Sequence, residues 1–335
     1  MPSFERESNR IVIAGASSLL GAELKSLLEE SRFAAADFRL LDEELAAGTL
    51  TEAGGEPAVI QPVEEGSFER ARFVFFTGSG EFTRRNFAGA KRGGAKIIDL
   101  SGGIAGDAGT VAWFPKLDAQ LGRELRRDAA GYVVPSAAAT EAAALTLALS
   151  RSGLRKLAMI FFQPASEAGR AGIEELESQT GELLSFQNIG QPVFDTQVAF
   201  NLLDRFGPAS GQKLGAIRER WRAETRACLG EKVALPFIQA VHAPVFYGTT
   251  LAAWAELEAC ANSAKIAEDC RSAGFVLTDE SDAGPSNVSA AGETSIQLAK
   301  PEADPSQPGS WWFWGAADNI RLPAANAVKL AEMLT

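Results

Sequence analysis

A short stretch near the middle of the chain, residues 133–141, has the residue types of a strand that turns sharply into a helix. Pro135 has no backbone N–H and ends the strand, and Ser136 can cap an alanine-rich helix that we expect to run to about Ser150. A nucleophile at such a corner lies at the positive end of a helix dipole, where free N–H groups can stabilise an oxyanion. The question for this stretch is therefore whether Ser136 is a nucleophile or only a helix cap.

A second stretch, near the N-terminus, has the spacing of a nucleotide-binding loop. An apolar strand at residues 11–14 precedes a loop from Gly15 to Gly21, which opens an amphipathic helix. Gly15 suits the tight turn of such a loop and Gly21 the packing of helix on strand, but Ser18 stands where a glycine would let the backbone approach a pyrophosphate. Asp42 ends the next strand, where an acidic residue would hold the ribose hydroxyls of NAD. The alternatives are an NAD-binding loop and a scaffold of the same shape that binds no nucleotide.

Composition indicates an ordinary globular protein and excludes several kinds of site. The chain has 335 residues, 46% of them hydrophobic, so two domains are expected. A formal net charge of -11 disfavours nucleic acid and anionic membranes as partners. The three cysteines, Cys228, Cys260 and Cys270, lack a C-x-x-C spacing, and His242 is the one histidine, so neither disulfides nor a metal site is indicated. Without a signal sequence or a membrane-length apolar run, we expect a cytoplasmic protein.

Short apolar strands alternate with helices in the first part of the chain, which predicts a parallel sheet with helices on its faces. The expected strands lie at about residues 11–14, 38–41, 58–60, 73–76, 95–98, 110–114 and 132–134. A glycine-rich turn containing Gly78 follows one of them and indicates a ligand crevice at the carboxyl edge of the sheet.

The pattern changes after the corner at Ser136. Two long apolar strands, 237–247 and 250–258, are separated by Gly248 and Thr249, which predicts a hairpin. Strands and helices around them indicate a mixed α+β domain, and a terminal helix at about 324–334 is apolar enough to dock on the first domain. We therefore predict an α/β protein with a Rossmann-like parallel-sheet domain and a second, α+β domain. The predicted domains are residues 1–134 together with 317–335, and residues 135–316.

A series of motifs along nearly the whole chain resembles the aspartate-semialdehyde dehydrogenase family. These motifs are G-A-S-S-L-L-G, F-F-T-G-S-G, I-I-D-L-S-G, Q-P-A-S-E-A-G-R-A-G-I-E-E-L-E-S-Q, A-P-V-F-Y-G-T-T-L and D-N-I-R-L-P-A-A-N. The resemblance implies a Rossmann domain, an α+β dimerisation domain, and a homodimer or a dimer of dimers. It also implies the NADP-linked reductive dephosphorylation of aspartyl phosphate in amino-acid biosynthesis.

The residues that carry this family's chemistry are absent at the matching positions. Either Ser136 or Ala137 matches the family's cysteine nucleophile, and Thr249 matches its histidine. A serine without a base is essentially unionised at neutral pH, so we expect Ser136 to be a helix cap. The chain therefore resembles the branch of dehydrogenase-like proteins that lack the catalytic cysteine and histidine.

The substrate-binding arginines of the family are also replaced. Ala105 stands at one of these positions and His242 at the other, where a neutral imidazole cannot replace a guanidinium fork for a carboxylate. His242 is either a functional imidazole or, as we expect, a hydrogen-bonded strand histidine. Gln163 and Glu224 are retained, so the resemblance implies Glu224 and His242 as the substrate-binding candidates.

The cofactor loop departs from the family in the same way. The arginine that would neutralise the extra phosphate of NADP is missing from the acidic run Asp42, Glu43 and Glu44, and Glu167 replaces a glycine beside the nicotinamide. NAD is therefore expected rather than NADP, unless the chain binds no cofactor. The candidate cofactor-binding residues are Gly15, Ser17, Ser18, Leu19, Leu20, Asp42, Gly78, Ser101 and Ser166.

Taken with the resemblance, these replacements predict a dimeric protein without the phosphorylating semialdehyde dehydrogenase activity, which could keep a dinucleotide or small acid for a regulatory or structural role. The alternative is an active NAD-dependent semialdehyde or acyl-phosphate oxidoreductase of amino-acid biosynthesis with different chemistry.

Overall fold

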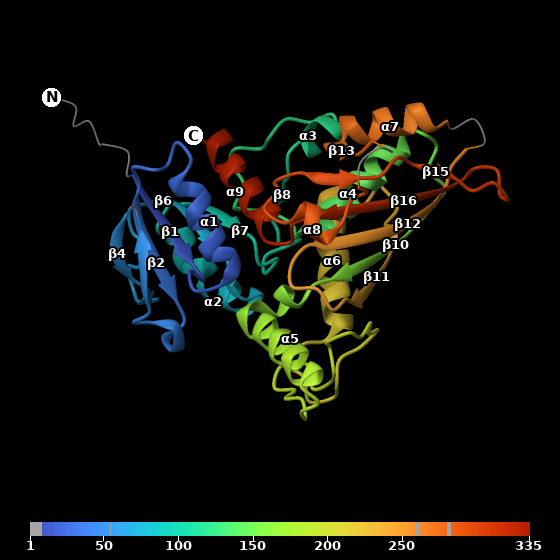
Figure 1. The fold of residues 1–335 in the computed structure, drawn as a ribbon. Coiled ribbons are helices and arrows are strands. Elements are labelled where there is room, and N and C mark those ends of the chain that lie inside the picture. Colours follow the sequence, from blue (N-terminus) through green and yellow to red (C-terminus); the bar gives the residue numbers. More distant parts are fainter. Residues whose placement is uncertain (1–8, 54, 259–261, 280–282) are drawn as a thin grey trace. The chain divides into compact units, whose positions relative to one another are not determined.

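A computed structural model describes residues 9–53, 55–258, 262–279 and 283–335 (Figure 1). The described residues divide into two units, each with its own large sheet. Unit 1 comprises the described parts of Met1–Phe114, Leu125–Val134 and Pro323–Thr335, and unit 2 those of Pro115–Glu124 and Pro135–Leu322.

Unit 1 is built on a parallel sheet with the strand order β5-β2-β1-β6-β7-β9-β8. The strands are β1 (Arg10–Ala14), β2 (Asp37–Asp42), β5 (Gln61–Pro62), β6 (Ala71–Phe76), β7 (Lys96–Asp99), β8 (Thr110–Ala112) and β9 (Gly131–Val133). The chain moves outward from β1 to β2 and then crosses back to β6, on the other side of β1. Ligands of such sheets bind at this switch point, beyond the carboxyl ends of the two strands. The predicted parallel sheet is confirmed.

The helices of unit 1 cover both faces of its sheet. They are α1 (Leu19–Glu29), α2 (Gly80–Arg92) and α9 (Arg321–Met333), of which unit 1 holds the part from Pro323. Side chains alternate along β1, so Ile13 packs in one core cluster with Leu24 of α1 and Ala327 of α9, whereas Val12 packs in a second with Phe82 of α2. The terminal helix therefore docks on the first sheet, as predicted.

The predicted strand at 58–60 is only partly correct. Its residues belong mainly to β4 (Glu56–Val59), which pairs antiparallel with β3 (Leu50–Ala53) in a separate ribbon. The edge of the parallel sheet is instead β5, and β2 is followed by the short 3-10 helix η1 (Glu44–Ala46). The sequence of β3 is too polar to be identified as a strand.

Unit 2 contains a mixed sheet with the strand order β11-β10-β12-β16-β14-β13, and β15 pairs with β16. The strands are β10 (Lys156–Gln163), β11 (Phe237–His242), β12 (Thr249–Glu256), β13 (Phe275–Leu277), β14 (Ile296–Leu298), β15 (Glu302–Ala303) and β16 (Ser310–Ala317). The pairs β10–β11 and β13–β14 are parallel, and the other pairs are antiparallel. This mixed sheet confirms the expected architecture of the second half.

The predicted hairpin between the strands around Gly248 is wrong. β11 and β12 both pair with β10, which lies between them, so the link at 243–248 passes over the end of β10. Pro244 within this link has no N–H to give to a strand, and it shortens the first of the two apolar runs to β11. Whether a third strand inserts between two others depends on pairing with a distant segment, which a two-residue turn signal does not indicate.

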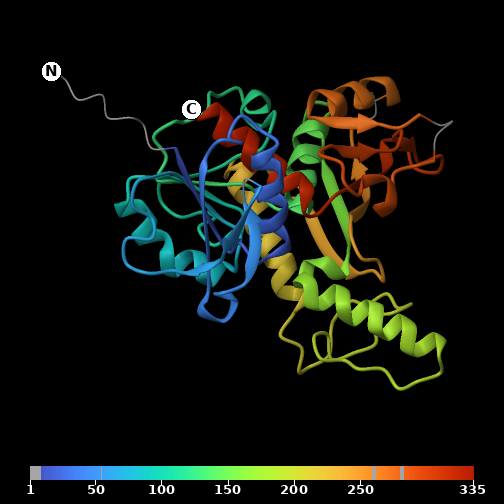
Figure 2. The same cartoon turned by 60° about the vertical axis from the view of Figure 1, so that its left-hand side comes forward.

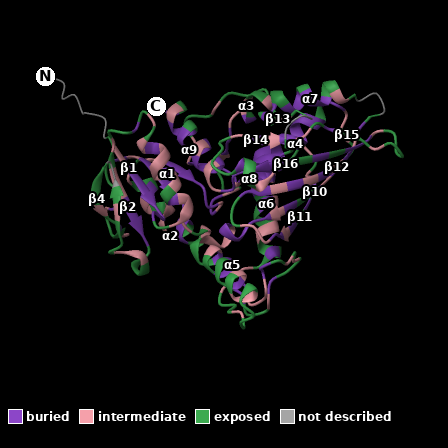
Figure 3. Cartoon of the chain, viewed as in Figure 1, coloured by how far each residue is buried: buried purple, intermediate pink, exposed green. Residues whose placement is uncertain are grey.

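The helices of unit 2 include one that is almost completely buried. They are α3 (Leu117–Gln120), α4 (Ala137–Ser150), α5 (Gly169–Leu184), α6 (Leu214–Leu229), α7 (Ser263–Ser272) and α8 (Asn287–Ala290), with the 3-10 helix η2 (Ala165–Ala168) before α5. All residues of α4 before Ser150 are buried, among them the acidic residue Glu141, and α4 contacts α6 and α7. Figure 2 shows α5 and the chain after it extending away from the sheet, and Figure 3 shows many exposed residues on this extension.

Candidate functional site

Two glycine-containing turns meet at the carboxyl edge of the sheet of unit 1. Gly15 follows β1 with a φ of +99°, and a Cβ atom on it would lie 2.2 Å from the backbone nitrogen of Gly78, in the turn after β6. A Cβ atom on Gly21 would lie 2.5 Å from the carbonyl oxygen of Gly15. Close backbone packing therefore requires glycine at both Gly15 and Gly21, in agreement with the tight turn and the helix packing that we predicted.

The hydroxyl of Ser18 joins these two turns. Its Oγ atom lies 2.8 Å from the carbonyl oxygen of Gly15 and 2.9 Å from that of Thr77, and it accepts a hydrogen bond of 2.9 Å from the N–H of Gly21. Ser18 is thus the N-cap of α1, and its side chain stabilises the loop in which the family pattern has a glycine.

The start of α1 provides backbone donors for an anion. The first hydrogen bond within the helix runs from the N–H of Ala22 to the carbonyl oxygen of Ser18. The N–H groups of Leu19 and Leu20 precede it, at the positive end of the helix dipole. These two amides are the groups of the loop that suit the phosphates of a dinucleotide.

Asp42 fixes the same loop from the end of β2. Its Oδ2 atom accepts hydrogen bonds from the N–H and the hydroxyl of Ser17, at 2.8 and 2.7 Å, and its Oδ1 atom accepts one of 2.8 Å from the N–H of Glu43. A carboxylate has about four lone-pair sites, so Asp42 can keep these bonds and still accept one from a ribose hydroxyl.

A hollow of about 510 Å³ lies beside Asp42 and is predominantly acidic. Its charged lining residues are Asp42, Glu43, Glu44, Glu64 and Arg85. Arg85 is paired with Glu43 at 2.7 Å. The excess of carboxylates would repel an additional phosphate group on the ribose.

Ser101 shapes the turn that follows β7. Its N–H and its hydroxyl donate to Oδ1 of Asp99 at 2.9 and 2.6 Å, and its hydroxyl lies 2.7 Å from that of Thr83. Asp99 is fully buried, which raises the pKa of its carboxyl group, while the hydrogen bonds from Ser101 and Ile104 oppose this shift. Ser101 is placed at the carboxyl edge, with its hydroxyl already committed to this network.

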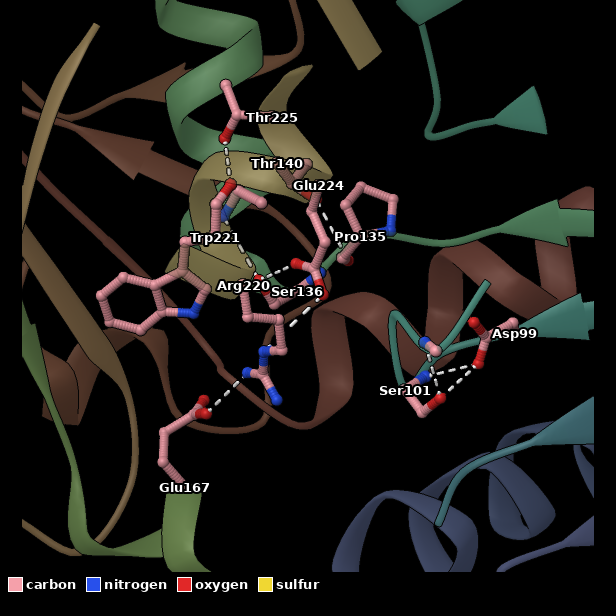
Figure 4. A network of polar contacts seen from close by, with 12 residues as sticks. Asp99, Ser101, Pro135, Ser136, Thr140, Glu167, Arg220, Trp221, Glu224 and Thr225 are labelled. Carbon is pink, nitrogen blue, oxygen red and sulfur yellow. Dashed lines mark hydrogen bonds and ion pairs between the residues drawn. The ribbon is translucent and has the colours of Figure 1, made fainter. Parts of the chain in front are cut away.

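Ser136, the corner residue from which the sequence analysis began, caps α4 as predicted. Its Oγ atom accepts a hydrogen bond of 3.4 Å from the N–H of Ala139, the third residue of the helix. The Ser136 hydroxyl donates to Oε2 of Glu224 on α6 at 2.6 Å, and its N–H donates to the same oxygen at 3.0 Å (Figure 4). The structure therefore brings together Ser136 and Glu224, two of the predicted site residues, within unit 2.

Arg220 extends this contact into an ionic network. It lies one helical turn before Glu224, and its Nε atom is 3.7 Å from Oε1 of Glu224. One of its terminal nitrogens is 3.1 Å from Oε2 of Glu167 in η2 (Figure 4). Oε1 of Glu167 in turn accepts a hydrogen bond of 3.3 Å from the side-chain amide of Asn319.

Ser166 belongs to the other end of this network. Its hydroxyl lies 3.0 Å from Nδ2 of Asn319, whose Oδ1 atom accepts a hydrogen bond of 3.0 Å from the N–H of Gly248. The bond to Gly248 identifies Oδ1 of Asn319 as the acceptor and so places the amide NH₂ group towards Glu167. The network therefore runs through unit 2 from the start of β12 to the start of α4.

Gln163 and His242 are Cα partners at the ends of the parallel strands β10 and β11, and both are buried. The His242 ring lies 5.5 Å from the ring of Phe194 and 5.4 Å from that of Phe206, measured between centroids. The ring nitrogens of His242 make no hydrogen bond of ordinary geometry with a described residue, and the side-chain oxygen of Gln163 also has no partner among these residues. Burial lowers the pKa of His242 to about 4, although the backbone of Val198 opposes the shift.

The prediction of a strand position for His242 is correct, because its backbone is hydrogen-bonded in both directions to Leu203, at 2.9 and 3.2 Å. Its imidazole packs against the rings of Phe194 and Phe206, and the polar group that faces it is the backbone of Val198. Its low pKa keeps the imidazole neutral at neutral pH, which removes the charge that would attract a carboxylate.

The remaining candidates, Thr249 and Ala137, are buried at element starts. Thr249 begins β12 opposite Ala317 of β16, and Ala137 is the first residue of α4. Neither side chain can act as a thiolate or as an imidazole base.

The motif that follows Gln163 contains two side chains that hold a loop in place. Glu175 and Gln179 are buried on α5. The carboxylate of Glu175 accepts hydrogen bonds from the N–H groups of Val193 and Phe194, and Oε1 of Gln179 accepts one of 2.8 Å from the N–H of Val198. The motif that makes the family resemblance most specific therefore attaches the segment after α5 to this helix.

Among the described residues, no cluster of histidine, cysteine and acidic residues could hold a metal ion, and no helix is long and apolar enough to cross a membrane. Cys228 and Cys270 are buried free thiols, and burial raises the pKa of Cys270 to about 12 and that of Cys228 further. Cys260 lies outside the described residues.

Sequence reasoning missed Arg220. The signal available for it was the spacing of four residues between Arg220 and Glu224, which places both on one face of a helix. That spacing is common on exposed helices, and the contact with Glu167 joins residues 53 positions apart.

Comparisons with known proteins cover almost the entire chain. The NAD binding domain of semialdehyde dehydrogenases matches residues 10–144, and the dimerisation domain of semialdehyde dehydrogenases matches residues 148–322. The USG-1 protein homolog of Pseudomonas aeruginosa is 28% identical over 332 residues, which cover 97% of each chain. Aspartate-semialdehyde dehydrogenase 2 of Vibrio cholerae is 25% identical over 329 residues, again covering 97% of each.

A solved structure shows the same fold. The structure of a probable aspartate-semialdehyde dehydrogenase from Pseudomonas aeruginosa has a TM-score of 0.86 and 27% sequence identity, and the match covers 97% of this chain and 98% of that one.

Proposed function

The chain belongs to the semialdehyde dehydrogenase family, and from this premise we propose that it has kept the family's fold and lost its phosphorylating semialdehyde dehydrogenase activity. The observation that supports this proposal most strongly is the hydrogen bonding of Ser136. Its hydroxyl caps α4 and donates to Glu224, a carboxylate that also faces Arg220. A hydroxyl in these bonds is not ionised, and it is a poorer nucleophile and leaving group than the thiolate that this chemistry needs.

The lack of a histidine at the matching position supports the same proposal. Thr249 occupies the position matched to the family's histidine, and His242, the one histidine of the chain, is buried among aromatic rings. General acid–base catalysis needs a group within hydrogen-bond reach of the substrate and with a pKa near the working pH. Neither condition is met by His242.

The test is a turnover assay. The purified chain is mixed with aspartate semialdehyde, phosphate and either NAD or NADP, and reduced cofactor is followed. We expect no turnover above the background without protein. Turnover that Ser136→Ala abolishes would contradict the proposal and favour the alternative of an active oxidoreductase, in which Glu224 serves as the base for Ser136 across their contact of 2.6 Å.

We further propose that unit 1 binds NAD in preference to NADP. The N–H groups of Leu19 and Leu20 would hold its phosphates and Asp42 its ribose, because these groups have the donors and acceptors that each part needs. A bound nicotinamide would supply a hydride acceptor. The acidic hollow at Asp42, Glu43 and Glu44 supports the choice of NAD, since its charge opposes a ribose phosphate.

Calorimetric titration with each dinucleotide tests this preference. We expect NAD to bind at least about tenfold more tightly than NADP, equivalent to about 1.4 kcal/mol. Glu44→Arg should reduce this difference, because Glu44 is exposed at the hollow and the change replaces a repulsive charge by an attractive one. Tighter binding of NADP by the unaltered chain would contradict the assignment.

The chain is also proposed to form a homodimer through the open face of the sheet of unit 2. Large apolar side chains project from this face on β10, β11 and β16, and they are 41–67% exposed: Ile160, Phe237, Trp312 and Trp314. The register places Trp314 and Ile160 on either side of Ala252 in β12, so the apolar surface is continuous across strands. Such a surface, in a domain that matches a dimerisation domain, fits a second copy of the chain.

Solution mass at micromolar concentration tests the dimer. Trp312→Glu should shift the mass towards that of a monomer, because it buries a charge in the interface. Leu45→Glu is the matched control, since Leu45 is a fully exposed apolar residue in unit 1. A monomeric unaltered chain, or a dimer unaffected by Trp312→Glu, would count against this interface.

A further inference from the structure

Arg220 joins two acidic residues, Glu167 and Glu224, that lie far apart in the sequence. Its guanidinium lies 3.7 Å from Glu224 and 3.1 Å from Glu167, measured from Nε and from a terminal nitrogen (Figure 4). The Arg220 side chain is 40% exposed, whereas those of Glu224 and Glu167 are only 1% and 12% exposed. A partly exposed cation therefore reaches inward to two enclosed anions.

Both carboxylates are held from their other sides by neutral donors. Oε2 of Glu224 accepts two hydrogen bonds from Ser136, and Oε1 of Glu167 accepts one from Asn319. Asn319 is itself fixed by the N–H of Gly248. The remaining oxygens thus converge on the guanidinium in positions set by other parts of unit 2, which is the property of a preorganised cation site.

A neighbouring pair on the same helix shows how this differs from an ordinary surface ion pair. Arg222 lies 3.1 Å from Glu219, and their side chains are 39% and 59% exposed. Water solvates both of these partners, so the pair contributes little to stability. Removing Arg220 would instead take a cation away from two largely buried carboxylates, and this lowers the free energy of unfolding more than the loss of an exposed ion pair does.

We propose that Arg220 is a built-in ligand that occupies a cation site formed by Glu167 and Glu224 and thereby closes this site. The excluded ligands are alkylguanidinium and alkylammonium ions, which carry the charge and the N–H donors that Arg220 supplies. The inference rests on the proposed function, because a permanently closed site is compatible with a chain that does not turn over a substrate there.

The test is chemical rescue of Arg220→Ala. We expect this variant to have an apparent melting temperature about 2–4 °C below that of the unaltered chain. Ethylguanidinium at millimolar concentration should restore it in a saturable manner, and calorimetry should show binding at least about tenfold tighter to Arg220→Ala than to the unaltered chain. Arg222→Ala is the matched control, and it should respond to ethylguanidinium only as it does to sodium chloride.

Equal binding by Arg220→Ala and the unaltered chain, or a rescue that also occurs in Arg222→Ala, would overturn the proposal. If Arg220→Ala does not fold, Arg220→Gln keeps a hydrogen-bonding side chain of similar reach without the charge, and the same binding comparison applies. Adding Glu224→Gln to the rescued variant should abolish the tight binding. Turnover in the dehydrogenase assay would refute the proposed function, whereas failed rescue in a chain without turnover would refute only the closed cation site.

Discussion

His242 should make unit 2 sensitive to acid. Its imidazole is fully buried between Phe194 and Phe206, and the effect of burial on its pKa outweighs that of its contact with the backbone of Val198. Protonation would place a charge in this aromatic environment. His242→Phe removes the titrating group and replaces it by a side chain of similar shape, so the variant isolates the effect of the proton.

The magnitude follows from the pKa of His242, which burial lowers from 6.5 to about 4. A base with a lowered pKa in the folded state binds its proton more readily in the unfolded state, so the folded chain loses stability as the pH falls from 6.5 towards 4. At 1.36 kcal/mol per pKa unit, the loss between about pH 7 and about pH 5 is about 2 kcal/mol. Over the whole shift the loss is about 3 kcal/mol.

Urea unfolding followed by tryptophan fluorescence, at both pH values, measures this loss. Titrating carboxyl groups are common to the unaltered chain and to His242→Phe, so their contributions cancel in the difference between the two. We expect the unaltered chain to lose about 2 kcal/mol more than His242→Phe on acidification. An equal loss in both would show that the imidazole is solvated or hydrogen-bonded, and the reasoning from its aromatic surroundings would fail.

Three further substitutions test the packing that supports the site. Glu141→Gln should stabilise the chain more as the pH rises above about 4.5, which unfolding at two pH values measures. Burial raises the pKa of this carboxyl group, which has no hydrogen-bond partner among the described residues, so above that pH the unfolded chain releases a proton that the folded chain keeps. Glu175→Ala should speed amide hydrogen exchange in the segment after α5 by removing an acceptor worth about 1–3 kcal/mol, whereas Glu177→Ala, at an exposed position of the same helix, should leave it unchanged. Gly15→Ala should destabilise unit 1 strongly, since its Cβ would lie 2.2 Å from a backbone nitrogen, whereas Gly48→Ala, with a φ of +85° and no atom near its Cβ, should cost only about 1 kcal/mol of backbone strain in thermal unfolding.

Local chemistry made much of the fold predictable. The alternation of apolar strands and helices identified the parallel sheet, and Pro135 with Ser136 identified the end of one strand and the cap of α4. Gly15 was also interpretable, because one backbone conformation and one close contact both demand it. In each case the signal lies within a few residues of the feature that it predicts.

The misses concern contacts between distant segments. β10 lies between β11 and β12, and no local turn signal could show this insertion. The aromatic surroundings of His242 come from the loop after α5, and the partner of Arg220 comes from η2. The family resemblance identified His242 and Glu224 as candidates, but their electrostatic state depends on neighbours that only the folded chain brings together.

A covalent intermediate is the most direct test of the central claim, that the family's fold persists here without its nucleophile. The purified chain can be incubated with aspartate semialdehyde and oxidised NAD or NADP, quenched in acid, and measured as intact protein and as peptides by mass spectrometry. We predict an unmodified mass for the peptide that contains Ser136 and Ala137. An acyl group on Ser136, present in the unaltered chain and absent from Ser136→Ala, would contradict the claim.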